Sequence, residues 1–226
     1  MSEQEGVTKY YLDFSRCPGR VFPGVDRLDG WRTLLHRLRL IGQEPTRYGG
    51  LGYGNISHRI GPFDTAHQQL RFIISGTQTG QLERLGVNHY CTVLAVEQSQ
   101  NRVVAEGPVK PSSEALTHAA VYASNQRIRY VLHVHSHEIW SQTQQLKIPA
   151  TPREVAYGTP QMAAAVGRLL CSKEMAERPI FSMSGHEDGI VSFGRTLDEA
   201  GQILIRYLAL ALAAAGIRGA ENKNQP

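Results

Sequence analysis

The segment from Tyr130 to His135, with the sequence Tyr-Val-Leu-His-Val-His, places the tightest constraint on the fold of this chain. Its apolar residues predict a short buried strand. Side chains alternate between the two faces of a strand, so His133 and His135 project to the same side. Two imidazoles at this spacing can share one metal ion, although the pattern also suits two polar residues at a strand end without a metal. His137 is third in the same series and is either a ligand or a neighbour.

A third ligand has to come from a distant part of the chain, and His186 is the best candidate. It lies in a glycine-flanked turn, Ser184 to Gly189, after a predicted strand. A histidine in such a turn is, taken alone, more often an ordinary turn residue. Three imidazoles would leave a coordination position open, as in catalytic zinc sites and unlike closed structural ones. Neutral ligands also leave the charge of the metal available to polarise a carbonyl or to stabilise an enediolate.

The sequence Pro111-Ser112-Ser113-Glu114 predicts the start of a helix that continues to about Ser124. Backbone N–H groups and the helix dipole favour an anion at such a start. Glu114 is therefore either a helix-stabilising residue or a carboxylate beside an anion site made by the two serines. Weaker candidate donors lie in turns and strand ends elsewhere, where these residue types are common for conformational reasons: Asn55, Ser57, Thr79 and Gly80.

Hydrophobic periodicity predicts alternating helices and strands along most of the chain. We expect helices over residues 26–41, 138–145, 159–173 and 197–215, and strands over 55–60, 71–74, 91–97, 103–104, 179–183 and 189–193. The strands between 55 and 104 predict a mainly antiparallel meander. Residues 1–23 are expected to be irregular because prolines and glycines punctuate them. We divide the chain into an N-terminal extension (1–25), one domain (26–218) and a polar C-terminal tail (219–226).

The composition excludes several classes of protein. A formal charge of +4 and a pI near 9.0 suit an anionic small substrate, whereas nucleic-acid binding would need basic residues clustered with aromatic ones, which are absent from the sequence. The nearest group is Arg32, Arg37 and Arg39, expected on the solvated face of the helix over 26–41.

Three scattered cysteines indicate neither a disulfide framework nor a thiolate metal site, so we expect them to be reduced. The acidic N-terminus excludes a secretory signal, and the longest apolar run, Tyr207 to Ile217, is too short to span a bilayer. These features predict a cytoplasmic protein with no membrane segment.

Five motifs, taken in order, resemble the class II aldolase/adducin family from about Asp26 to Ile217. They are Gly54-Asn55-Ile56-Ser57, Thr77-Gln78-Thr79-Gly80, Pro111-Ser112-Ser113-Glu114 with His118, His133-Val134-His135 and Gly185-His186. The resemblance implies an α/β protein, a three-layer α/β/α sandwich around a central mainly antiparallel sheet. It also implies a four-fold symmetric homotetramer with active sites at the subunit interfaces.

The resemblance further assigns roles to residues. It implies one divalent metal per subunit, zinc first, with manganese, cobalt or iron as alternatives, held by His133, His135 and His186. Glu114 matches the acid/base glutamate of the family. A sugar phosphate is the implied substrate, and the residues that match its phosphate site are Asn55, Thr79, Gly80, Ser112 and Ser113, with Ser57 at the same strand end.

The implied function is a metal-dependent lyase that cleaves a small phosphorylated ketose or related hydroxy-keto compound through a metal-stabilised enediolate. One departure keeps alternatives open. Aldolases of the family place a proton-donating tyrosine shortly after an Ile-Pro stretch, but after Ile148-Pro149 no tyrosine precedes Tyr157. Dehydration, decarboxylation or pentulose-phosphate epimerisation at the same site, and a non-enzymatic adducin-like interaction domain, are the alternatives. Arg153, in that stretch, is a candidate for binding an acidic group of the substrate.

Overall fold

The computed structural model describes residues 8–61, 63, 70–172, 175 and 178–223. Its centre is a nine-stranded sheet with the order β1-β7-β6-β5-β4-β8-β11-β10-β9. Within the described part of the chain, the pairs β1–β7 and β9–β10 are the parallel ones, and the other neighbours run antiparallel. The mainly antiparallel sheet expected from the sequence is confirmed.

The central sheet, a small second sheet and five α-helices are the main described elements. The sheet strands are β1 (Tyr11–Arg16), β4 (Asn55–Ile60), β5 (Arg71–Ser75), β6 (Tyr90–Glu97), β7 (Arg102–Gly107), β8 (Tyr130–His135), β9 (Ala150–Thr151), β10 (Ile180–Met183) and β11 (Gly189–Gly194). The helices are α1 (Val25–Arg37), α2 (Ala115–Ser124), α3 (His137–Ser141), α4 (Pro160–Leu170) and α6 (Leu197–Lys223). A small second sheet pairs β2 (Gly42–Gln43) with β3 (Gly52–Tyr53).

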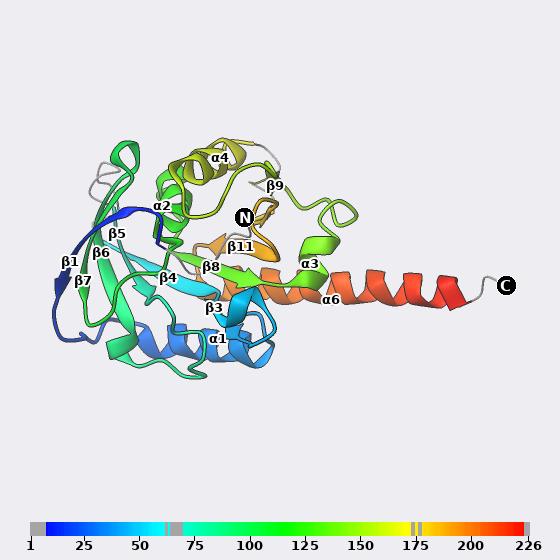
Figure 1. Ribbon diagram of the computed structural model, residues 1–226, viewed down its shortest axis with the longest axis horizontal. Coiled ribbons are helices and arrows are strands. Elements are labelled where there is room, and N and C mark those ends of the chain that lie inside the picture. The colour runs from blue at the N-terminus through cyan, green and yellow to red at the C-terminus, as the bar shows by residue number, and fades with distance from the viewer. Residues whose placement is uncertain (1–7, 62, 64–69, 173–174, 176–177, 224–226) are drawn as a thin grey trace.

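Helices cover both faces of the sheet, so the molecule has three layers (Figure 1). The helices α2 and α4 pack together on one face, and α1, α3 and α6 cover the other. Each face has its own hydrophobic core, because successive residues of β8 point to opposite sides: Val131 belongs to the core under α2, and Leu132 to the core under α6. The expected α/β/α sandwich is confirmed, and the histidines of β8 share the face of Val131.

The expectation that residues 1–23 are irregular is wrong for Tyr11–Arg16, which form β1 and pair in parallel with β7. This strand lies at the edge of the sheet, where Leu12 and Phe14 pack against the core and alternate with Asp13 and Ser15. The alternation is short, and the prolines and glycines that follow it favour an irregular segment. The division of the chain at residue 25 stays a prediction, although the segment before it supplies a strand to the common sheet.

Four helix ends also differ from expectation. The helix α1 stops at Arg37 rather than Ile41, and α3 stops at Ser141 rather than Gln145. The helix α4 stops at Leu170, and its expected end at Lys173 lies outside the described residues. The helix α6 continues past the expected end at Ala215 to Lys223, and its last turns project beyond the body of the molecule (Figure 1).

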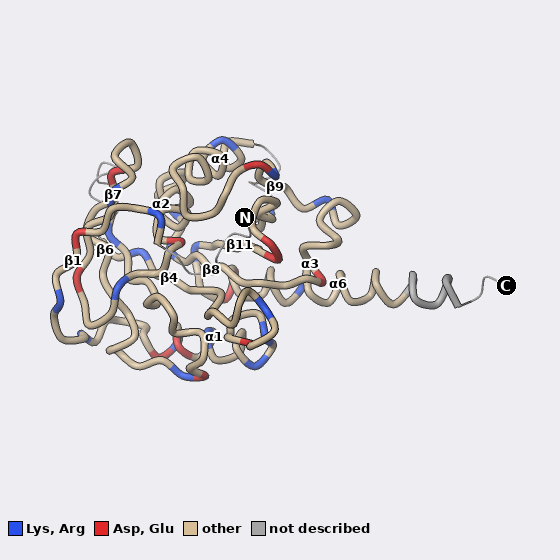
Figure 2. The backbone as a smooth tube through the Cα atoms, viewed as in Figure 1, with Lys and Arg blue, Asp and Glu red and all other residues tan. Residues whose placement is uncertain are grey.

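Two surface properties follow from the described residues. Basic and acidic residues are interspersed over this part of the chain rather than separated by sign (Figure 2). No helix within the described residues combines the length and the apolar character needed to cross a bilayer.

Candidate metal centre

Three histidines meet at the end of β8. One ring nitrogen from each of His133, His135 and His186 lies within 4.8 Å of the others, and Nε2 of His135 is 3.0 Å from Nε2 of His186. All three side chains are buried. A shared metal site requires His186 to lie beside His133 and His135, and the structure places the three rings together.

The sheet explains why the third histidine reaches the other two. The strand β11 pairs antiparallel with β8, with Gly189 opposite His135, so the turn before β11 returns to the end of β8. His186 lies in this turn after Gly185. A Cβ at position 185 would come within 2.2 Å of the carbonyl oxygen of Val155, so only glycine lets the turn pack this closely.

The environment keeps the three imidazoles neutral. Burial lowers the pKa of His133 to about 3. Burial, reinforced by the neighbouring histidines, also holds the pKa of His135 and of His186 well below the ordinary value. Neutral imidazole is the form that binds a metal, because its lone pair is not occupied by a proton. The donor set therefore fits a divalent ion such as zinc.

Asn55 orients the first of these ligands. Its side-chain amide lies 3.2 Å from Nδ1 of His133, while Oδ1 of Asn55 and Nε2 of His133 are buried without a hydrogen-bond partner among the described residues. Exchanging the two ends of the amide lets Oδ1 accept a proton from Nδ1, which leaves the lone pair of Nε2 for a metal. The exchange satisfies both buried atoms once an ion is bound.

We therefore expect Asn55→Ala to weaken metal binding by about 10- to 100-fold, the range found when a partner that orients a ligand is removed. Asn55→Asp keeps an acceptor for Nδ1 and should retain most of the affinity. Competition with a chromophoric chelator measures both variants. Equal affinities in the alanine variant and the unchanged protein would show that Asn55 does not orient His133.

A small pocket next to the histidines is lined by neutral hydrogen-bonding groups. Its lining residues are Gly52, Gly54, Asn55, Gly76, Thr77, Gln78, Thr79, Gly80, Ser112 and Ser113. Five of the six residues expected to bind phosphate lie here. Position 80 has to be glycine, because a Cβ there would come within 2.1 Å of the carbonyl oxygen of Gly42.

Arg32 holds one wall of this pocket from behind. The expectation that Arg32 lies on a solvated helix face is wrong, since only 1% of it is exposed. Its guanidinium donates to the carbonyl oxygens of Thr79 (2.9 Å), Gly80 (3.3 Å), Leu82 and Glu83 (2.8 Å). The carbonyl oxygens of this loop accept hydrogen bonds from the arginine. The backbone N–H groups of the loop can therefore point in other directions.

Ser57, the sixth expected phosphate ligand, is used inside the protein instead. It is fully buried, and its Oγ lies 2.6 Å from Nδ1 of His118 and 2.7 Å from the hydroxyl of Tyr122. It is not among the residues that line the pocket. Ser57 therefore ties α2 to β4, which places the start of α2 over the histidine end of the sheet.

This burial makes His118 a source of pH dependence. Burial holds the pKa of His118 well below 6.5, so the folded protein binds fewer protons there than the unfolded chain does once the pH falls under that value. Its contribution to stability is present above pH 6.5 and is lost on acidification, by about 1.4 kcal/mol per pH unit. Urea unfolding of the metal-free protein at pH 7.5 and 5.5 measures the loss. The variant His118→Gln should lose less stability over this interval; an equal loss would contradict the assignment.

Glu114 is the N-cap residue of α2, immediately before the helix, at the same end of the sheet. It is 1% exposed, follows the two serines of the pocket and donates its backbone N–H to Oγ of Ser112 (3.3 Å). Asn55 lines the same pocket and contacts His133, so the pocket links the start of α2 to the three histidines. The expected helix start is confirmed, with α2 running from Ala115 to Ser124.

Two other candidates lie apart from the three ring nitrogens. His137 starts α3, and its side chain is 70% exposed and pairs with Asp188, so it is a neighbour of the site. The side chain of Arg153 is exposed and borders a different, open groove with Trp140 and Ser184. Only its backbone approaches the site, against Gly185. Binding of a substrate acid by Arg153 stays a prediction that this position does not favour.

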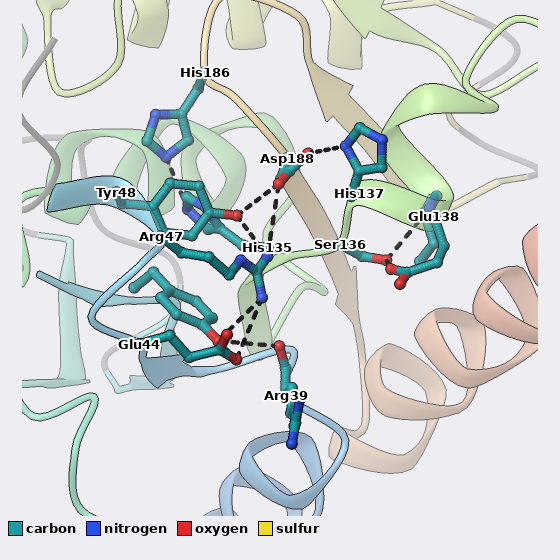
Figure 3. A network of polar contacts seen from close by, with 12 residues as sticks. Arg39, Glu44, Arg47, Tyr48, His135, Ser136, His137, Glu138, His186 and Asp188 are labelled. Atoms are coloured by element: carbon teal, nitrogen blue, oxygen red, sulfur yellow. Dashed lines mark hydrogen bonds and ion pairs between the residues drawn. The ribbon is translucent and has the colours of Figure 1, made fainter. Parts of the chain in front are cut away.

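A polar network around His135 was not predicted from the sequence (Figure 3). The hydroxyl of Tyr48 donates to Oδ2 of Asp188 (2.7 Å) and accepts from Arg47 (2.6 Å), while Nδ1 of His137 lies 3.0 Å from Oδ1 of Asp188. These bonds hold the ring of Tyr48 edge-on to His135 at 4.6 Å. Burial and the Asp188 carboxylate raise the pKa of Tyr48, so its hydroxyl keeps its proton. Asp188 lies two residues after His186 in the sequence, and this spacing is the signal that could have suggested the network.

The fold and the donor set define a class of protein, an α/β/α sandwich with three clustered imidazoles that could hold one divalent metal. A model of the Class II Aldolase and Adducin N-terminal domain matches residues 46–213. The chain belongs to the class II aldolase/adducin family. The family resemblance drawn from the motifs is confirmed.

Solved structures show the same fold at low sequence identity. An L-fuculose-1-phosphate aldolase from Thermus thermophilus has a TM-score of 0.62 and 18% identity, with 89% of this chain and 97% of that chain covered. A sugar-phosphate aldolase from Thermotoga maritima has a TM-score of 0.62 and 13% identity, covering 85% and 95%. A further L-fuculose 1-phosphate aldolase has a TM-score of 0.61 and 16% identity, covering 92% and 91%.

Proposed function

We propose that this protein is a metal-dependent lyase that cleaves a small phosphorylated ketose or a related hydroxy-keto compound. The observation that carries the proposal is the convergence of three buried, neutral imidazoles beside a pocket of neutral hydrogen-bond donors. Solved relatives with this fold include proteins described as sugar-phosphate aldolases, which supports the substrate class.

His133, His135 and His186 are the residues that would hold the ion, with zinc as the first choice and manganese, cobalt or iron as alternatives. A divalent metal, when bound, supplies Lewis-acid stabilisation of the negative charge that develops on substrate oxygens. Three protein ligands leave room for the substrate, whereas a structural site would be closed by a fourth.

The residues of the chain divide the remaining work. Asn55, Thr79, Gly80, Ser112 and Ser113 bind the phosphate through uncharged donors and fix the substrate at one end. In cleavage, the hydroxyl group of the departing fragment loses its proton to solvent as its carbonyl forms, and Glu114 delivers a proton to the carbon that keeps the electrons of the broken carbon–carbon bond. Burial of the site excludes water from this step.

The direct test is to incubate the purified protein with a panel of ketose 1-phosphates, with and without a chelator, and to follow dihydroxyacetone phosphate. Chelator-sensitive release would support the lyase. Mass analysis of the products separates the alternatives, since dehydration loses water, decarboxylation loses carbon dioxide and epimerisation keeps the mass. Absence of any chelator-sensitive change in every substrate would contradict the proposal and favour an adducin-like interaction domain.

We also propose the assembly that the family resemblance implies, a four-fold symmetric homotetramer in the cytoplasm. Sedimentation equilibrium measures the mass of the assembly directly. A monomeric mass at micromolar concentration would contradict it.

A further inference from the structure

The segment before β1 is anchored next to the candidate site. The backbone N–H of Tyr11 donates to the carbonyl oxygen of Asn101 (2.8 Å), and the side-chain amide of Asn101 donates to the carbonyl oxygen of Lys9 (2.8 Å). Between them, the buried Tyr10 donates its hydroxyl to the carbonyl oxygen of Ser112 (2.8 Å), one of the pocket serines. Contacts at the carbonyl group of Lys9 and at the two residues after it therefore fix its backbone near the residues that precede α2.

The side chain of Lys9 extends from this anchor toward the histidines. Its aliphatic stem lies beside Gly158, whose backbone also approaches the carbonyl oxygen of Ser113. Its Nζ lies 3.9 Å from the centre of the Tyr157 ring, a cation–π contact that fixes the ammonium. The buried Tyr157 ring in turn lies 4.3 Å from the ring of His186. Lys9 thus lies one aromatic ring away from the metal centre.

The other charged groups around the site bear on what Lys9 can bind. All ten residues that line the small pocket are uncharged, and Arg32 behind it spends its donors on loop carbonyls. Arg47, on the other side of His135, is engaged with Tyr48, Glu44 and Asp188. Lys9 supplies a positive charge on the Tyr157 side of the histidines.

We propose that Lys9 is a substrate-binding residue of this site, whose ammonium pairs with an anionic oxygen group of the substrate, a phosphate or a carboxylate. The inference rests on the proposed function and deepens it, because it assigns a binding role to the segment that precedes the sheet. A charged hydrogen bond of this kind also draws anionic ligands toward a pocket that otherwise offers neutral donors.

Isothermal titration calorimetry with phosphoglycolate, in the presence of zinc, tests the proposal without turnover. We expect Lys9→Met to weaken binding by roughly 10- to 100-fold, as for the loss of a hydrogen bond to a charged group. The affinity of Lys9→Arg for phosphoglycolate should lie between those of Lys9→Met and the unchanged protein. The matched control is Lys147→Met, which removes an exposed lysine from the loop between α3 and β9 and should bind as the unchanged protein does. Parallel titrations with inorganic phosphate and with glycolate show which group Lys9 contacts.

Equal dissociation constants for Lys9→Met and the unchanged protein would overturn the proposal, as would the absence of phosphoglycolate binding to the unchanged protein. A purely structural role would lower the unfolding midpoint of Lys9→Met, which we expect to stay the same. Kinetics separate this inference from the lyase assignment. If chelator-sensitive cleavage occurs and KM is unaffected in Lys9→Met, only Lys9 is misassigned. If Lys9→Met weakens phosphoglycolate binding but no ketose phosphate is cleaved, only the lyase assignment fails.

Discussion

Replacement of His135 by alanine is expected to abolish stoichiometric metal binding and chelator-sensitive turnover together. Its Nε2 is 3.0 Å from that of His186, at the centre of the three-histidine group, so two imidazoles would remain where a catalytic site uses three protein ligands. The loss of affinity should exceed roughly 100-fold, the upper range for residues that only orient a ligand. Elemental analysis after dialysis measures the metal, and the ketose 1-phosphate assay measures the turnover.

Two further histidine variants control for this result. His89→Ala removes an imidazole whose Nδ1 accepts from the backbone N–H of Gly86, far along the chain from the site, and should keep both metal and activity. His137→Ala removes an exposed neighbour and should keep the metal, because its ring lies outside the three-histidine group. A full equivalent of zinc in His135→Ala would mean that the three rings do not share an ion.

Much of the candidate site could be predicted because its signals are local. Alternation along one strand puts His133 and His135 on the same side, and β8 has the bounds that this pattern predicted. The serines before Glu114 likewise mark the start of α2. These features depend on the residues immediately around them, so no long-range contact had to be known.

The features of the site that the sequence did not predict depend on contacts between distant segments of the chain. The guanidinium of Arg32 is buried because the loop from Thr79 to Glu83 offers it carbonyl oxygens, a match that no helical pattern shows. Ser57 bonds His118 on α2, although a polar residue at a strand end suits a pocket equally well. Lys9 reaches Tyr157 only because β1 pairs with β7, across a long stretch of chain. Such partners follow from the order of the strands in the sheet, which no local pattern contains.

Glu114→Gln is expected to lower kcat by about 10²- to 10⁴-fold, the usual contribution of a general acid or base. Glutamine has nearly the same size but cannot exchange a proton, while the three histidines and the phosphate donors remain. Metal content and phosphoglycolate affinity should therefore stay close to those of the unchanged protein. The effect would appear in kcat, because the lost proton transfer occurs after the substrate has bound.

The same variant decides between the two roles that the sequence left open for this carboxylate. A residue that only stabilises α2 through the helix dipole contributes about 0.3–1 kcal/mol, so its loss would lower the unfolding midpoint and leave kcat unchanged. The loss of an acid/base residue would instead lower kcat and leave the unfolding midpoint unchanged. Glu97→Gln removes a carboxylate that pairs with Arg102 at the far end of β6 and controls for the loss of charge. Unchanged kcat in Glu114→Gln, with a lower unfolding midpoint, would assign Glu114 to the helix rather than to the reaction.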